Sequence, residues 1–269
     1  MTTIIRIPVF GALLLAFLPA CNNNNQEPVT KKEDIPVQEK EMKDAIAKYP
    51  DSMLLRENLI QYYQDNGTTD LALAETNTAL QKDSTDTRLW DKKAELHIEQ
   101  ADTAGAIKAY EKAIEIFPEP QFIMSLGWLY AQTKDTNAIV MADALLMGKN
   151  ARADKEALLI KGLYFSATGN KQKALGYFDN CLALDYTFML AYREKAIVLY
   201  DMAKYEEALK VLDKAVTLQN KFDEGYYWMG RCFEKLNKTN DAIESYRSAV
   251  LCNPDYIEAK DALGRLGSK

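Results

Sequence analysis

Apolar residues recur every three or four positions across the segment 89–118, and the rest of the chain repeats this segment. The spacing predicts two short helices, over about 87–100 and 103–117, because residues at such intervals share one helix face. Asp102 or Thr103 is placed to cap the second helix, and a proline ends it. Because one such helix pair cannot bury both of its apolar faces, the pattern also predicts neighbouring pairs.

The same pattern returns along the chain in register. Large residues stand at the fourth position of most units, with Arg56 as an exception. A small residue early in each second helix recurs at spacings of 34, 32, 36, 34 and 34 residues, as Ala72, Ala106, Ala138, Ala174, Ala208 and Ala242. This register resembles the tetratricopeptide repeat, whose helix-turn-helix period is 34 residues. The resemblance implies an all-α fold, a right-handed superhelical solenoid of antiparallel helix pairs.

The repeat register divides the chain into an array over residues 36–266 and a tail over 267–269. The array is expected to open with an unpaired helix, whose charged face suits an end cap, and to close with a capping helix over 257–266. The irregular third unit is interpreted as a change of superhelical twist and not as a domain break. Six repeats are expected between the two end helices, at about 53–86, 87–119, 120–154, 155–188, 189–222 and 223–256.

The N-terminal segment 1–20 has one basic residue, a short apolar run and a small residue before Cys21, which is the pattern of a secretory signal peptide. The tetrapeptide LPAC resembles a bacterial lipobox. This resemblance implies that Cys21 is lipidated, with acyl chains such as palmitate, and becomes the first residue of the mature protein. The alternative is an ordinary signal peptide cut after Ala20, with Cys21 incidental.

Residues 21–35 are polar and without periodicity, so we expect a disordered tether between the lipid and the folded array. The resemblance to lipoproteins also bears on localisation. Asn22, and not an aspartate, follows the cysteine, which implies a protein anchored in the outer membrane of a bacterial envelope. Because the tether has no acidic cluster beside the cysteine, the periplasmic face is preferred over the exterior.

Candidate chemistry is sparse. The net charge of −6 and the absence of a dense basic run argue against nucleic acid as a partner. His97, the only histidine, is expected to be a core residue without a positioned partner, and Cys181, Cys232 and Cys252 to be buried free thiols. No zinc or nucleotide motif occurs. The chain is therefore expected not to be an enzyme, with no catalytic residue, metal, cofactor or small-molecule substrate.

A binding role remains. In the family that the chain resembles, the first helices of successive units line a concave groove. The residues that this resemblance assigns to partner binding are Met124, Trp128, Leu159, Leu163, Arg193, Ile197, Tyr200, Tyr227 and Arg231. The groove is expected to be acidic at its N-terminal end, apolar in the middle, and aromatic and basic at its C-terminal end. The open alternative is that neighbouring units bury the apolar members of this set.

Two functions remain open. The first is a non-catalytic adaptor on the bacterial envelope that binds a segment of another protein in the groove. The second is a structural subunit of an outer-membrane assembly or secretion complex, held through side or end surfaces. In either case the partner is another protein, and the membrane is reached through the lipid anchor.

Overall fold

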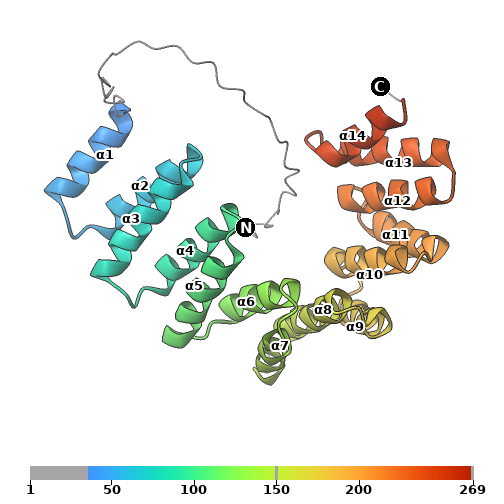
Figure 1. Cartoon of the computed structure of the whole chain (residues 1–269), viewed down its shortest axis with the longest axis horizontal. Helices are drawn as coiled ribbons and strands as arrows, with labels where there is room; N and C mark the ends of the chain where they lie inside the picture. The colour runs from blue at the N-terminus through green and yellow to red at the C-terminus, as the bar shows by residue number, and fades with distance from the viewer. Residues whose placement is uncertain (1–35, 149–150, 268–269) are drawn as a thin grey trace, which may run out of the picture. The chain divides into compact units, whose positions relative to one another are not determined.

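The computed structural model describes residues 36–148 and 151–267, and within them every regular element is an α-helix (Figure 1). The expected signal peptide, the tether, Cys21 and most of the expected tail lie outside these residues. The described part holds 14 helices: α1 (Val37–Lys48), α2 (Met53–Asp65), α3 (Thr69–Lys82), α4 (Thr87–Glu99), α5 (Thr103–Ile116), α6 (Pro120–Gln132), α7 (Asn137–Met147), α8 (Ala151–Ala167), α9 (Lys171–Leu184), α10 (Met189–Asp201), α11 (Tyr205–Leu218), α12 (Asp223–Lys235), α13 (Thr239–Cys252) and α14 (Ile257–Arg265).

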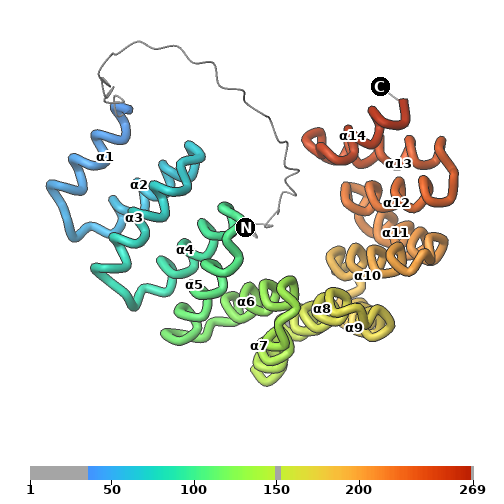
Figure 2. Tube along the Cα trace, viewed as in Figure 1, coloured from blue at the N-terminus to red at the C-terminus, as the bar shows by residue number. Residues whose placement is uncertain are grey.

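Short turns join consecutive helices, so that packed neighbours run antiparallel, as the tube in Figure 2 shows for α10 and α11. The all-α fold of helix pairs that the sequence predicts is confirmed. The predicted cap is confirmed as well, because the Asp102 carboxylate accepts a hydrogen bond of 2.9 Å from the Gly105 amide in the first turn of α5.

The chain divides into two compact units, one up to Ala106 and the other from Ile107 onward, and the division falls inside α5. In the first unit α1 packs on α2, α2 on α3, and α3 on α4. In the second unit each helix from α6 to α14 packs on the next. There the first helices of successive pairs also touch, α6 with α8, α8 with α10, and α10 with α12.

Glycines let the helices of a pair approach closely in the second unit. A Cβ on Gly162 of α8 would lie 2.4 Å from the Phe178 ring of α9, and a Cβ on Gly230 of α12 would lie 2.6 Å from the Tyr246 ring of α13. Both rings are fully buried. The aromatic residue of the second helix therefore occupies space that the first helix leaves empty.

The end helix α1 uses its charged face differently from the expectation. Glu39, on the charged face that was expected to cap the array, is 8% exposed and accepts a hydrogen bond of 2.8 Å from the Tyr63 hydroxyl of α2. The Lys43 ammonium lies 2.7 Å from the same carboxylate and holds the pKa of Glu39 below its usual value. The Glu39 side chain thus joins α1 to α2. It can be buried because Lys43 compensates its charge and the Tyr63 hydroxyl donates a hydrogen bond to it.

The irregular third unit keeps its packing. Helix α8 begins at Ala151, ahead of residue 155, where the fourth unit was expected to start. Because α7 packs on α8, Leu145 is 3% exposed, whereas Met147 at the end of α7 is 78% exposed.

Candidate functional site: the first-helix face

The residues predicted to bind a partner all lie on the first helices of their pairs in the second unit. We call these residues, together with Trp228, the first-helix face. They are Met124 and Trp128 on α6, Leu159 and Leu163 on α8, Arg193, Ile197 and Tyr200 on α10, and Tyr227, Trp228 and Arg231 on α12.

Leu159 does not belong to an accessible surface, and its prediction as a binding residue is wrong. Its side chain is 0% exposed and lies in a core cluster with Phe178 of α9 and Ala191 of α10. Helix α8 packs on α6, α7, α9 and α10, and Leu159 lies on a side of the helix that this packing covers. The alternative of burial between units therefore holds for this residue.

Other apolar members keep part of their surface. Trp128, Leu163 and Tyr200 pack against the core cluster of α8 to α12 but remain partly exposed. Met124 and Ile197 are also partly exposed. These five side chains can both support the packing and contact another molecule.

Arg193 forms ion pairs within the chain. Its guanidinium lies 2.7 Å from Glu194 on its own helix and 2.7 Å from Glu224 on α12, and its side chain is 20% exposed. Burial acts to lower the pKa of Arg193, but the two carboxylates outweigh it and the pKa is raised. This cluster joins α10 to α12, and its charge is already compensated.

Tyr200, Tyr227 and Arg231 come together with Trp228, which the sequence reasoning missed. The Arg231 guanidinium lies 5.3 Å from the ring centre of Tyr200, 5.8 Å from that of Tyr227 and 5.2 Å from that of Trp228. Tyr200 and Trp228 also make an edge-to-face contact at 5.4 Å. A sequence signal for Trp228 did exist, because Tyr227 and Trp228 stand four and three residues before Arg231 and so share its side of the helix.

His97 has a partner, which corrects the expectation that it has none. Its Nδ1 lies 2.9 Å from the Asp102 carboxylate, and its side chain is 14% exposed. The other oxygen of that carboxylate caps α5. The contact therefore lies at the turn between α4 and α5, beside the Asp102 cap, which is a structural position.

The cysteines differ from one another. Cys181 and Cys232 are buried, and burial raises the pKa of each thiol to about 12, so neither is a reactive thiolate. Cys252 is partly exposed, against the expectation of burial. Across the described residues there is no cluster of three metal-binding side chains, and no helix there combines the length and apolar character needed to cross a bilayer.

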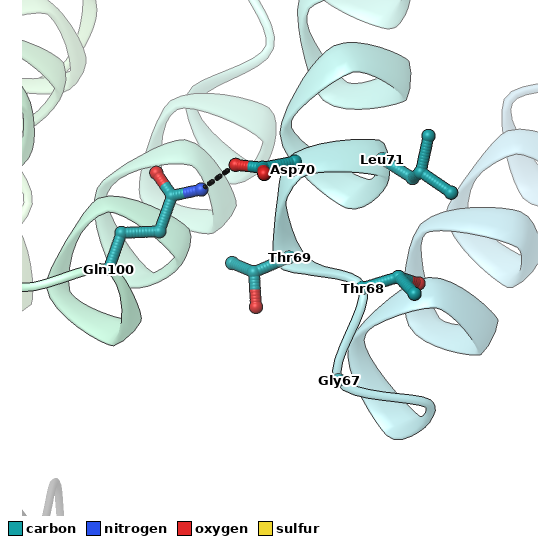
Figure 3. Close-up of a pocket in the computed structure, with 6 residues that line it drawn as sticks. All are labelled: Gly67, Thr68, Thr69, Asp70, Leu71 and Gln100. Carbon is teal, nitrogen blue, oxygen red and sulfur yellow. Dashed lines mark hydrogen bonds between the residues drawn. The ribbon is translucent and has the colours of Figure 1, made fainter. Parts of the chain in front are cut away.

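A shallow hollow in the first unit lies apart from the predicted residues. It is lined by the turn from Gly67 to Thr69, by Asp70 and Leu71 of α3, and by Gln100 (Figure 3). The Gln100 amide donates a hydrogen bond of 2.5 Å to the Asp70 carboxylate, so these two polar groups satisfy each other. The lining residues include no cation, and their one carboxylate already accepts a hydrogen bond.

Family models support the repeat assignment over part of the chain. The tetratricopeptide repeat model matches residues 87–120, and a second model of the same description matches residues 193–257. Both segments agree with the register that the alanine spacing predicts.

Solved structures with the same fold include bacterial proteins. A tetratricopeptide repeat protein from Parabacteroides merdae is similar with a TM-score of 0.71 at 20% identity, covering 86% of this chain and 91% of that chain. PilW, a type IV pilus biogenesis factor, is similar with a TM-score of 0.59 at 19% identity, covering 78% of this chain and 97% of that chain. At these identities the likeness concerns the fold alone.

Curated relatives match over short parts of their length. The STIP1 homolog of Dictyostelium discoideum is 32% identical over 30% of this chain and 15% of its own length. Human protein O-mannosyl-transferase TMTC1 is 24% identical over 56% of this chain and 17% of its own length. The chain thus spans less than a fifth of either relative. With the family models and the solved structures, these matches show that the chain contains tetratricopeptide repeats, a fold that generally mediates protein–protein interactions and is typically a non-catalytic scaffold.

Proposed function

We propose that this protein is a non-catalytic adaptor of the bacterial envelope that binds a segment of a partner protein on the first-helix face. One observation carries the proposal. The first helices α6, α8, α10 and α12 touch in succession and hold partly exposed apolar and aromatic side chains along the second unit. Apolar and aromatic residues of this kind are the usual anchors of peptide recognition.

The polar residues of the first unit support this assignment. There the equivalent positions on α2 and α4 carry polar residues with one apolar exception, Ile98. The polar residues are Glu57, Gln61, Gln64, Asp91 and Glu95. The repeat therefore does not require apolar side chains at these positions. Ile197 and Met124 keep exposed area although a polar residue would fit, which favours a contact with another molecule.

A second candidate, a structural subunit held through its outer surfaces, is favoured by a different observation. Large apolar residues are exposed near the C-terminal ends of α9, α11 and α13. They are Leu184 at 59%, Tyr186 at 63%, Leu218 at 42% and Leu251 at 84% exposure. A partner covering these helix ends would bind the chain without using the first-helix face.

Two lysine substitutions separate the candidates. We expect Ile197→Lys to lower partner affinity at least about tenfold, because the new ammonium would lose its hydration under a bound segment. Leu251→Lys, the matched control, adds the same charge on α13 and should leave binding unchanged. The measurement is quantitative recovery of cross-linked partners from envelope extracts, with the melting temperature of each variant taken alongside.

The opposite pattern would contradict the adaptor. If Leu251→Lys loses the partner while Ile197→Lys retains it, the second candidate is correct. If Ile197→Lys also lowers the melting temperature by several degrees, a second face variant, Met124→Lys, decides the question on α6.

The envelope location is part of the proposal and rests on the sequence of the N-terminal segment. We expect Cys21→Ser to move the protein from the membrane fraction to the soluble fraction, or to leave an uncleaved precursor, because several acyl chains at roughly 0.8 kcal/mol per buried methylene hold a protein on a membrane. Mass spectrometry of the mature N-terminus checks this. An unmodified Cys21 in a soluble mature protein would remove the anchor and leave the binding role untouched.

A further inference from the structure

Arginines of the second unit bridge successive first helices, and two of them are neutralised within the chain. Arg265 of α14 lies 2.6 Å from the Glu234 carboxylate of α12 and donates to both of its oxygens. Arg193 of α10 pairs with Glu224 of α12 at 2.7 Å. In both cases the guanidinium of one helix meets a carboxylate of the neighbouring one.

Arg231 repeats the Arg265 arrangement with one change. It stands 34 residues before Arg265, and Tyr200 stands 34 residues before Glu234, so the same two repeat positions meet across α10 and α12. The Arg231 Nη2 donates to the Tyr200 hydroxyl at 3.3 Å, and its Nη1 donates to the Tyr227 hydroxyl at 3.1 Å. Within residues 36–148 and 151–267 no carboxylate forms an ion pair with Arg231. A phenol thus replaces the neutralising carboxylate.

The remaining hydrogen-bonding capacity here consists of donors. Arg231 keeps its Nε–H and one N–H on each terminal nitrogen, because a guanidinium has five donors and only two are used. Each tyrosine oxygen accepts from Arg231, so its own O–H is left to donate. The rings of Tyr200, Tyr227 and Trp228 surround the guanidinium, and all four residues are partly exposed. A set of donors around one cation on an accessible face is suited to an anion.

The geometry favours a carboxylate over a phosphate. The site offers a single cation, and the carboxylates of Glu224 and Glu234 on the same helix are already paired with Arg193 and Arg265. A phosphate with nearly two negative charges would meet only one positive charge, whereas a carboxylate carries one charge and matches the planar fork of arginine.

We propose that Arg231, with the hydroxyls of Tyr200 and Tyr227, binds the carboxylate of an aspartate or glutamate side chain in the partner segment. This inference rests on the proposed function and specifies the ligand of the same face. The partner's acidic residue takes the place that Glu234 takes beside Arg265, and the aromatic rings contact the apolar residues next to it.

The first experiment uses acetate as the probe and observes arginine Nε–H signals by ¹⁵N NMR at constant ionic strength. The Arg231 signal is assigned by its loss in Arg231→Lys, and we expect it to shift saturably with acetate. The Arg265 signal should not shift, because the Arg265 guanidinium is already paired with the Glu234 carboxylate. Glu234→Gln should make the Arg265 signal respond as well. Tyr200→Glu should abolish the Arg231 response by supplying an internal carboxylate, while Tyr200→Gln, the control of similar size, should retain it.

Two outcomes overturn the carboxylate site in this experiment. One is an Arg231 signal that does not move with acetate in a folded protein. The other is saturation by inorganic phosphate at lower concentration than by acetate, which would assign the site to a phosphorylated partner.

The second experiment selects binding peptides from a displayed random library on the wild-type protein. Selected peptides are expected to carry Asp or Glu at a fixed distance from an apolar residue. Changing that acid to its amide, or Arg231→Gln in the protein, should each weaken binding about ten- to a hundredfold, and the two changes together no more than either alone. Arg265→Gln combined with Glu234→Gln is the matched control, because it removes a bridging ion pair without freeing a carboxylate beside Arg231, and it should leave the affinity unchanged.

This experiment distinguishes a failure of the carboxylate site from a failure of the proposed adaptor function. Peptides that bind the first-helix face through apolar residues alone, with equal affinity for Arg231→Gln, would overturn the carboxylate and keep the adaptor. Peptides that bind elsewhere, with affinity unaffected by Ile197→Lys, would overturn both.

Discussion

Phe178→Ala is expected to lower the free energy of unfolding by about 3–5 kcal/mol, the range for a fully buried aromatic residue cut back to its Cβ. Phe178 is 0% exposed on α9, and its ring fills the space beside Gly162 of α8. Its core neighbours Ala174 and Cys181 are small and cannot reach into the void. The cavity will therefore persist, and its full cost will appear in urea unfolding.

The position of the damage is a further part of this prediction. In a repeat array each pair is coupled to its neighbours, so hydrogen exchange should rise most in α8, α9 and α10. Phe178→Leu, which keeps most of the apolar volume, is the control and should cost about 1–2 kcal/mol. A loss below about 1 kcal/mol for Phe178→Ala, or equal loss of protection in every helix, would contradict the packing described.

Arg56→Met is expected to cost about 2–3 kcal/mol in the first unit. The Arg56 side chain on α2 is 9% exposed and pairs with Glu75 of α3, which is 18% exposed. Removing the cation leaves the Glu75 carboxylate largely out of water without a partner, and such a change is strongly destabilising in a buried pair. Because Glu75 retains some exposure, the expected cost is below that of a fully buried carboxylate.

The double variant gives the sharper measurement. Arg56→Met with Glu75→Met replaces the pair by two apolar side chains and should recover most of the stability, because the cost of desolvating the charges disappears with them. Urea unfolding of the two single variants and the double variant measures the coupling, expected at about 1–2 kcal/mol. A double variant less stable than Arg56→Met alone would show that the unpaired Glu75 carboxylate is not what destabilises the single variant.

Much of the fold could be predicted from the sequence because the relevant forces act locally. The spacing of apolar residues sets which residues share a helix face, and Asp102 caps α5 as its position predicted. The alanines of the repeat register are all buried, as close contact between the helices of a pair requires. These features depend on neighbours within a few residues or on one repeated contact.

The candidate site depended on how each helix is turned toward its neighbours, which spacing along one helix does not fix. Leu159 was assigned to the binding face by its repeat position, yet it is buried in the core cluster that α8 forms with α9 and α10. Glu39 lies on the charged face that was expected to cap the array, yet it is buried beside Tyr63 and Lys43.

The site formed by Arg231, Tyr200, Tyr227 and Trp228 depends both on the local sequence and on the tertiary structure. The sequence by itself determined that Tyr227, Trp228 and Arg231 share one side of α12, because residues three and four apart on a helix are neighbours. Only the tertiary structure decided that Tyr200, from α10, stands where Glu234 stands beside Arg265. The physical reason is that the charge balance of an arginine depends on atoms within a few ångströms in space, and residues distant in sequence supply them.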